Sequence, residues 1–453
     1  MVVNMITNHE LETIRSEKIG GGLGDANGLS WAFGLAMLVG EQEVEVTDKD
    51  RDILRELAKE VAEIAAKPEQ HAKLLHWQNH NMLEETLPLV FCDPESAWYE
   101  IIPAKTLKCK TPLARIWEFK LRKELYWARV LQDDRPILAR FAIQTVFHLT
   151  SRGLEHRING SGLGHAYRWD APLTDTELLD ALVPQRLVID KEKTNELLTL
   201  AKEIFGGILS VCEEGVFWWS FGLTSDVIYL RGLEQMMVDI YDNPAFLHKL
   251  MSFLCDEAQQ KLTFLEEGGY LTPNVGIDFI GTGGYGFTQD LPQEGMNLKL
   301  MDLWGYSESQ ETVGISPNAF EEFIFPYQNS ILKRFGLNIY GCCEPLERRW
   351  NTVSQIDRLR RVTVSPWSDV NIAAQQLGKK YVYVRKVNPS YMALPDLQVE
   401  PAREQLRETF KATKANGCPA EVLLRDVITL GGNPNNAVEW VKLARSEAAK
   451  IYG

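Results

Sequence analysis

The sequence lacks any apolar run that approaches the roughly 20 residues a membrane-spanning helix needs. The longest candidate, residues 31–39, is far shorter, and it has neither the basic front nor the cleavage site of a secretion signal. Basic residues are in deficit, since 48 Lys and Arg face 62 Asp and Glu, a formal net charge of -14. Because affinity for nucleic acid rests on clustered positive charge, this balance argues against DNA or RNA as a partner.

Cysteine is also scarce, with 7 residues in a chain of 453. Without an export signal, these cysteines are better explained as reduced thiols than as a disulfide framework. We therefore expect a cytoplasmic chain with no membrane partner. A content of 45% hydrophobic and 24% charged residues is ordinary for a globular protein, and the length suffices for one large domain plus an appendage.

The first 134 residues predict a mostly helical N-terminal extension. Apolar residues recur at three- and four-residue steps from about 48 to 80, and a second helical stretch follows at 113–131. A Gly-rich stretch at 20–24 has no strand before it and no Lys-Ser or Lys-Thr after it, so it predicts a turn rather than a phosphate loop. We divide the chain into the extension, residues 1–134, and a main domain, residues 135–453.

After residue 134 the sequence changes to short apolar runs separated by helical stretches, the alternation typical of a β/α fold. Near-continuous apolar runs indicate parallel strands buried on both faces. Eight such runs predict strands, the number that a (β/α)8 TIM barrel requires. They are residues 137–147, 216–221, 269–275, 298–304, 337–340, 361–364, 381–384 and 421–424. We predict an α/β protein, a TIM barrel with an N-terminal helical extension.

In such a barrel the chemistry lies at the carboxyl ends of the strands. The most informative stretch is Tyr-Gly-Cys-Cys-Glu-Pro-Leu at 340–346, which places two thiols and a carboxylate where a buried strand should end. Other polar or aromatic residues follow the remaining predicted strands. They include His148, Trp218, Trp304, Tyr306, Glu308, Glu311, Trp367, Arg385, Asn388 and Asp426.

Two further stretches, Asp-Ile-Tyr-Asp-Asn-Pro at 239–244 and Ile-Ser-Pro-Asn-Ala-Phe-Glu-Glu-Phe-Ile-Phe-Pro-Tyr at 315–327, are ordered landmarks. They resemble the Asp-Pro turn and the Ser-Pro-x-x-Phe-Glu-Glu-Phe-x-x-Pro-Tyr signature of the uroporphyrinogen decarboxylase superfamily. That superfamily includes zinc-dependent methyltransferases that use methylated corrinoid proteins. The similarity runs from about residue 217 to the C-terminus, and the part before it looks like a less characterised branch with an extra front segment. The resemblance also implies a homodimer.

The chain departs from both known groups of the superfamily. It has no Phe-Met-Arg-Gln-Ala-Gly-Arg-like loop, which argues against porphyrinogen decarboxylation. Corrinoid methyltransferases present His-x-Cys after the fifth strand and a further Cys after the eighth. Here Cys342 matches the first ligand Cys, Tyr340 replaces the His, and residues 424–432 contain no Cys. A zinc site would have to be rebuilt from Cys342, Cys343, Asp426 and the nearby glutamates.

The predicted site has three groups of residues. The catalytic candidates are Glu308, Glu311, Tyr340, Glu344 and Arg385. The substrate-binding candidates are Trp218, Trp304, Tyr306, Trp367, Asn388 and His148. The metal-binding candidates are Cys342, Cys343 and Asp426.

Each group has a structural alternative. Neighbouring residues at a strand end point to opposite sides, so Cys342 and Cys343 are not easily joined on one metal, and a free Cys is often a small buried hydrophobe. The glutamates can instead bind backbone amides or cap a helix, and large aromatic residues are more often core. Arg385 can hold an anion or pair with a neighbouring acid, and a lone His is more often structural.

The resemblance implies the substrate-side methyltransferase of a corrinoid-dependent system. Such an enzyme acts as a demethylase on a small methoxylated or methylated compound and passes the methyl group to a cobalamin protein, with zinc as a Lewis acid. An alternative is a decarboxylase of a non-porphyrin acid, in which Arg385 holds the carboxylate and Asp426 or Glu308 moves a proton. A third interpretation is a non-catalytic barrel that binds a small molecule.

Overall fold

The structure is a computed structural model that describes residues 43–154, 157–159, 168–215, 218–277, 279–295 and 297–453. In its first part, the helical stretch predicted from about 48 to 80 is divided into two helices, and the stretch predicted at 113–131 is helical. Helix α3 (Asp48–Ala65) begins after Thr47, whose side chain accepts a hydrogen bond from the amide of Asp50, and it buries the apolar residues of its repeat. Helices α4 (Pro68–Asn81) and α6 (Pro112–Tyr126) follow, each with proline in its first turn, where the missing N–H costs nothing.

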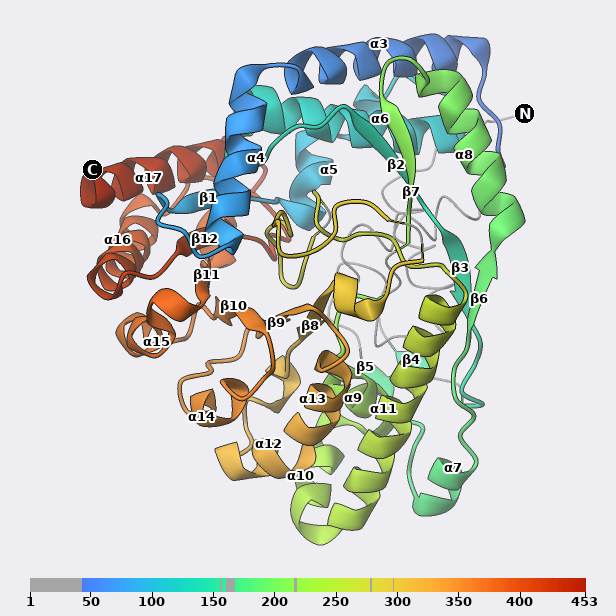
Figure 1. Cartoon of the computed structure of the whole chain (residues 1–453), viewed down its shortest axis with the longest axis vertical. Coiled ribbons are helices and arrows are strands. Elements are labelled where there is room, and N and C mark those ends of the chain that lie inside the picture. Colours follow the sequence, from blue (N-terminus) through green and yellow to red (C-terminus); the bar gives the residue numbers. More distant parts are fainter. Residues whose placement is uncertain (1–42, 155–156, 160–167, 216–217, 278, 296) are drawn as a thin grey trace.

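The central element is a parallel sheet of six strands in the order β1-β12-β11-β10-β9-β8 (Figure 1). All five strand pairs are parallel. The chain is therefore an α/β protein. The strands are β1 (Leu89–Cys92), β8 (Trp304–Ser307), β9 (Leu337–Tyr340), β10 (Leu359–Val364), β11 (Val382–Lys386) and β12 (Ala420–Leu424).

Three separate strand pairs complete the described strands. Strands β2 (Arg140–Gln144) and β7 (Ser210–Glu214) pair in parallel. Two antiparallel pairs are β3 (Val146–Leu149) with β6 (Leu187–Asp190), and β4 (Arg157–Asn159) with β5 (Arg168–Asp170).

The predicted barrel of eight strands is therefore recovered only in part. Strands β9 to β12 confirm the last four predicted runs. The run at 269–275 is not a strand. Of the run at 216–221, residues 216–217 lie outside the described ranges and residues 218–221 are not a strand; the nearest strand, β7, ends before this run. Among the described residues the sheet ends at β1 and β8, so a closed barrel is not formed by hydrogen bonding.

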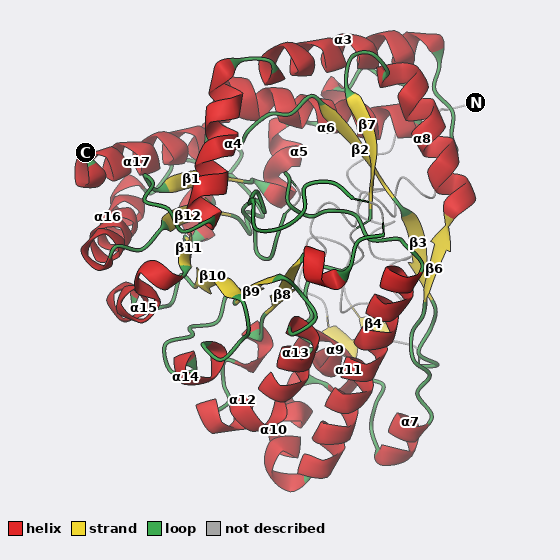
Figure 2. Cartoon of the chain, in the orientation of Figure 1, coloured by secondary structure: helices red, strands yellow, loops and turns green. Residues whose placement is uncertain are grey.

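The long segment between helix α11 (Pro244–Glu267) and β8 has a physical reason not to form a strand of the sheet. Gly281, Gly283 and Gly284 have φ angles of 65°, 130° and 88°, which a β-strand does not use. The segment instead fills the inner side of the sheet, where Tyr285 and Phe287 pack with residues of β1, β11 and β12. Figure 2 shows most of its described residues as loop between the sheet and helix α11, apart from a short 3-10 helix at Leu300–Asp302.

Strand β1 lies in the part of the chain predicted as an extension, yet it pairs with β12 at four positions, from Leu89 with Glu421 to Cys92 with Leu424. Residues 1–134 and 135–453 thus share one sheet.

Helices cover the outer side of the sheet, as Figures 1 and 2 show for α15, α16 and α17. The Ser-Pro landmark forms two short helices, with the Ser316 side chain accepting from the amide of Ala319 at the first turn. No helix of the described ranges is long and apolar enough to span a membrane. The remaining helices are α5 (Trp98–Ile101), α7 (Thr176–Asp180), α8 (Lys191–Phe205), α9 (Thr224–Arg231), α10 (Leu233–Asp242), α11 (Pro244–Glu267), α12 (Pro317–Phe323), α13 (Phe325–Leu332), α14 (Trp350–Val353), α15 (Val370–Leu377), α16 (Val399–Asn416) and α17 (Asn435–Tyr452).

Candidate functional site

The Cys-Cys-Glu stretch begins where β9 ends. Strand β9 stops at Tyr340, and Gly341 turns the chain with a φ of 98°. A Cβ atom at this position would lie 2.8 Å from Leu346 Cδ1 and 3.1 Å from the carbonyl oxygen of Thr363, so the positive φ and the close neighbours both favour glycine. Because Cys342 and Cys343 lie beyond the strand, the alternation of side chains along a strand does not separate them.

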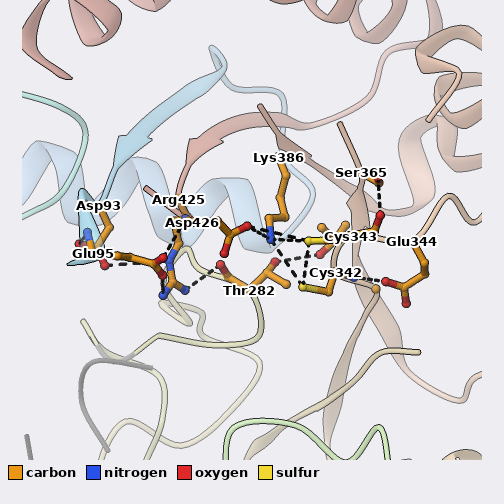
Figure 3. Close-up of polar contacts among 12 residues, drawn as sticks. Asp93, Glu95, Thr282, Cys342, Cys343, Glu344, Ser365, Lys386, Arg425 and Asp426 are labelled. Atoms are coloured by element: carbon orange, nitrogen blue, oxygen red, sulfur yellow. Dashed lines mark hydrogen bonds and ion pairs between the residues drawn. The ribbon is translucent and has the colours of Figure 1, made fainter. Parts of the chain in front are cut away.

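Lys386 brings both thiols together at the carboxyl edge of the sheet (Figure 3). Its Nζ atom lies 3.5 Å from Cys342 Sγ and 3.3 Å from Cys343 Sγ, and it forms an ion pair with Asp426. The two sulfur atoms are 3.7 Å apart. This group of four residues, Cys342, Cys343, Lys386 and Asp426, is called the thiol–lysine cluster below.

The cluster favours a thiolate at Cys343. A hydrogen bond from the Cys342 thiol lowers the pKa of Cys343, and the Lys386 ammonium adds to this shift. The same hydrogen bond, with burial, raises the pKa of Cys342 well above its ordinary value. Burial alone would lower the pKa of Lys386, but Cys342 and Asp426 beside it raise that pKa well above the ordinary lysine value. Lys386 therefore holds its proton more strongly than an exposed lysine.

A second charged group adjoins the cluster. Arg425 forms an ion pair with Glu95 and donates from Nη1 to the carbonyl oxygen of Thr282 at 2.7 Å. The amide of Asp426 donates to Glu95 Oε2 at 2.8 Å. Glu95 and Asp426 have φ angles of 46° and 60°, a left-handed conformation that costs about 1–2 kcal/mol for a residue with a Cβ. Backbone strain of this kind concentrates at functional sites.

Three glutamates lie on the other side of the cluster, in the loops after β8 and β9. Glu344 joins the two loops, because Oε1 accepts from the amide of Ser309 at 2.8 Å and Oε2 from the amide of Cys342 at 2.9 Å. Glu308 Oε2 accepts from the amide of Gln310 at 2.9 Å. Glu311 accepts from the Thr224 hydroxyl at 2.7 Å.

These carboxyl groups hold protons more strongly than exposed glutamates. Burial raises the pKa of Glu308 well above its ordinary value, and the charges of Glu311 and Glu344 add to the effect. Burial also raises the pKa of Glu311 and of Glu344. Among the three, Glu308 has the pKa that is raised furthest, so it is the carboxyl group that keeps its proton to the highest pH.

Zinc requires three converging protein ligands in a catalytic site. Within the ranges that the structure covers, no three His, Cys, Asp or Glu side chains are grouped so as to hold a metal ion. The place between Cys342, Cys343 and Asp426 is taken by the Lys386 ammonium. In this arrangement these residues do not fit a resident zinc ion.

Two catalytic candidates face away from the cluster. Tyr340 is the outward residue of β9, and its hydroxyl donates to Gln328 Oε1 at 2.7 Å on the helix side. Arg385 is the outward residue of β11 and donates to the carbonyl oxygen of Ser365. Side chains alternate along a strand, so the neighbouring Lys386 points inward instead.

The substrate-binding candidates are dispersed. Trp304 and Tyr306 lie on the inner side of the sheet, and the Tyr306 hydroxyl donates to the carbonyl oxygen of Gly341 at 3.3 Å, next to the cluster. Trp218 packs against Phe335, with ring centroids 5.7 Å apart, among the residues of the helix side.

The other three lie at the surface or serve local structure. The side chain of Trp367 is 70% exposed. Asn388 caps a short 3-10 helix by accepting from the amide of Ser390. His148 is an exposed residue of β3, which belongs to a separate strand pair.

Lys386, Arg425 and Glu95 were missed by the sequence analysis. Lys386 follows Val382 and Val384 at two-residue steps, which places it on their inward face. However, β11 is buried along its whole length, so its polar and apolar residues do not alternate between an exposed and a buried face. The sequence alone therefore does not show that Lys386 and Arg385 have different surroundings.

No protein-family model and no curated protein matches the chain. Among solved structures, a methyltransferase from Methanosarcina mazei is similar to it with a TM-score of 0.44 and 11% sequence identity. The similarity covers 84% of this chain and 98% of that chain. At this level it carries no argument about function, which must rest on the site itself.

Proposed function

We propose that the chain is the substrate-side methyltransferase of a corrinoid-dependent system. It would take a methyl group from a small methoxylated or methylated compound and pass it to the corrinoid of a partner protein. The observation that carries this proposal is Glu308, a buried carboxyl group of raised pKa at the carboxyl edge of a parallel sheet. The superfamily signature at 315–327 agrees with it.

The reaction needs a proton. When a methyl group leaves an ether, the oxygen keeps the electron pair of the broken bond and departs as an alkoxide or phenolate, which is a poor leaving group until it is protonated. Glu308 keeps its proton to a higher pH than an exposed glutamate, because burial raises the pKa of this carboxyl group. It would donate that proton to the departing oxygen, and the corrinoid of a partner protein would serve as the methyl acceptor. The proton would stabilise the departing oxygen, as zinc would do as a Lewis acid. Methyl transfer by this route requires no metal ion in this chain.

Lys386 and Arg425 supply positive charge on the inner side of the same edge. They offset the acidic residues around them and limit how much negative charge the site carries. Tyr306 and Trp304 are buried in the apolar core beneath this edge.

The test is turnover with Co(I) cobalamin as methyl acceptor and a panel of methoxylated aromatic acids and methylated amines as donors. Glu308→Gln is expected to lower kcat by about 10²- to 10⁴-fold, the usual contribution of a general acid. In the unsubstituted chain, kcat should fall as pH rises through the raised pKa of Glu308, because the acid then loses its proton. This alkaline limb should be absent from the variant.

Glu321→Gln is the matched control, since Glu321 is an exposed glutamate of helix α12. It is expected to leave kcat unchanged. Full activity in Glu308→Gln would contradict the role of Glu308, and tight binding of a donor without turnover by the unsubstituted chain would favour the non-catalytic interpretation.

A decarboxylase is a second candidate, and a specific observation favours it. Lys386 is a buried cation on the inward face, at the edge where Glu308 lies, so it can hold a substrate carboxylate in place of the outward-facing Arg385. Glu308 would then protonate the carbon that loses carbon dioxide. Release of carbon dioxide from a carboxylic acid without any corrinoid would establish this reaction and exclude methyl transfer as the main activity.

A further inference from the structure

Cys342 and Cys343 are neighbours in the chain whose sulfur atoms lie 3.7 Å apart. Among the cysteines that the structure describes, these two have sulfur atoms in contact, and both thiols are free. Cys343 is half-buried and Cys342 is buried. The proposed methyl transfer uses neither thiol as a reacting group, so the pair invites a chemical role of its own.

We propose that Cys342 and Cys343 are a dithiol site for trivalent arsenic, which they bind as an organoarsenic group bridging both sulfur atoms. The proposal does not rest on methyl transfer, because it needs only the two thiols and their surroundings. It assigns a ligand class, thiol-seeking trivalent arsenicals, to this edge of the sheet.

The number of available ligands selects this class. Trivalent arsenic forms three bonds. In an organoarsenic group one of them is to carbon, so two sulfur atoms complete it, whereas catalytic zinc needs three protein ligands. The site offers two thiols with a lysine between them and Asp426. A direct disulfide would require the sulfur atoms to approach to about 2 Å. A bridging atom tolerates the wider separation observed here.

The reaction balances without an oxidant or reductant. An arsine oxide, R–As=O, loses its oxygen while two As–S bonds form. Both thiol protons leave with that oxygen as one water molecule, and arsenic stays trivalent. Cys343 reacts first, because it is the more exposed thiol and its thiolate lies 3.3 Å from the Lys386 ammonium. Cys342 then closes the ring.

The reaction leaves the charges around the two thiols paired. Once both sulfur atoms are bound to arsenic they carry no charge, and Lys386 keeps its ion pair with Asp426. Glu344 holds the amide of Cys342 at 2.9 Å, so the backbone of the pair is fixed before the arsenical arrives. No buried charge is left without a partner by the reaction.

The experiment treats the folded full-length chain with phenylarsine oxide and measures the intact mass. We expect about one phenylarsenic group per chain, retained in excess of a monothiol and removed by the dithiol 2,3-dimercaptopropanol. Cys342→Ser and Cys343→Ser should each abolish retention. Cys212→Ser, which removes a half-buried thiol outside the pair, should retain the full amount.

A second measurement needs no variant. After arsenical treatment and unfolding, alkylation with N-ethylmaleimide should add two fewer groups than in the untreated chain, and peptide mapping should place both protected thiols at 342 and 343. Retention by either serine variant, protection of other cysteines, or an unsubstituted chain that keeps no arsenical would each overturn the proposal.

Discussion

Two adjacent cations on β11 have opposite surroundings. Lys386 lies among two thiols and the carboxylate of Asp426, whereas Arg385 lies on the helix side with a backbone carbonyl as its hydrogen-bond partner. Burial lowers the pKa of Arg385, while neighbouring acidic groups raise that of Lys386. The electrostatic effect of each cation on the thiols should therefore differ sharply, although the two residues are adjacent in sequence.

Replacing Lys386 should make Cys343 less reactive. In Lys386→Met the hydrogen bond from Cys342 remains, but the attraction of the ammonium for the thiolate is lost, so the pKa of Cys343 should rise. An increase of one unit would slow alkylation by iodoacetamide near neutral pH about tenfold, since the thiolate is the reacting form. The measurement is the alkylation rate of the Cys343 peptide as a function of pH.

Lys386→Arg is the matched control and should keep the Cys343 pKa low, because it keeps the positive charge. Arg385→Met provides a second comparison, and the Cys343 pKa should not change in it. A shift in Arg385→Met as large as that in Lys386→Met would mean that the two side chains are not separated by the strand.

Among the elements, helix α11 is tied to the segment after β3 through one buried carboxylate. Arg152 Nη2 lies 2.7 Å and Lys261 Nζ 2.8 Å from Glu257 Oε1, and the amide of Gln185 donates to Glu257 Oε2 at 2.7 Å. Burial alone would raise the pKa of Glu257, but the hydrogen bond and charge of Arg152 lower it to about 2.

Glu257→Gln should destabilise the chain. The pKa of Glu257 falls from 4.5 to about 2 on folding. At a pH above the unfolded-state pKa, the ionised group therefore contributes roughly 3 kcal/mol to the free energy of unfolding. That contribution is present at neutral pH and is lost as pH falls from 4.5 towards 2. We expect the free energy of unfolding at pH 7 to drop by about 2–4 kcal/mol in urea titrations.

Glu267→Gln removes an exposed carboxylate near the end of the same helix and should change the free energy of unfolding little. The difference between the two variants should shrink at low pH, where Glu257 of the unsubstituted chain is protonated as well. An equal loss of stability in both variants at pH 7 would contradict the importance of the buried cluster.

The sequence predicts strands with regular backbone conformation better than segments whose residues have positive φ angles. Runs such as 337–340 and 421–424 are short, apolar and bounded by turn residues, and they are strands. The run at 269–275 was also predicted as a strand, but it is loop. The glycines that follow it have positive φ angles, and the residues after them pack in the core without forming a strand. Hydrophobic periodicity does not reveal such backbone conformations. The Cys-Cys-Glu residues were proposed as site candidates from their residue types. Lys386 was not, because its place in the site depends on which face of a fully buried strand it occupies.

At the scale of the whole molecule, the N-terminal part completes the sheet. Strand β1 lies against β12, and helix α17 packs behind it (Figure 1). Residues of α3 and α6 share one apolar core with α16 and α17. Since the part before residue 135 supplies both an edge strand and a share of this core, the two parts of the chain should fold together.

A chain that begins at residue 135 should therefore fail to fold. It would leave the backbone groups of β12 unpaired along one edge and expose the apolar face of α17, and such surfaces drive aggregation. A chain that begins at residue 43 keeps every described element and is the matched control. Circular dichroism and limited proteolysis should show cooperative unfolding and resistance in the longer chain alone. A shorter chain that unfolds cooperatively would instead show that residues 135–453 contain a complete domain, with β1 an addition to its edge.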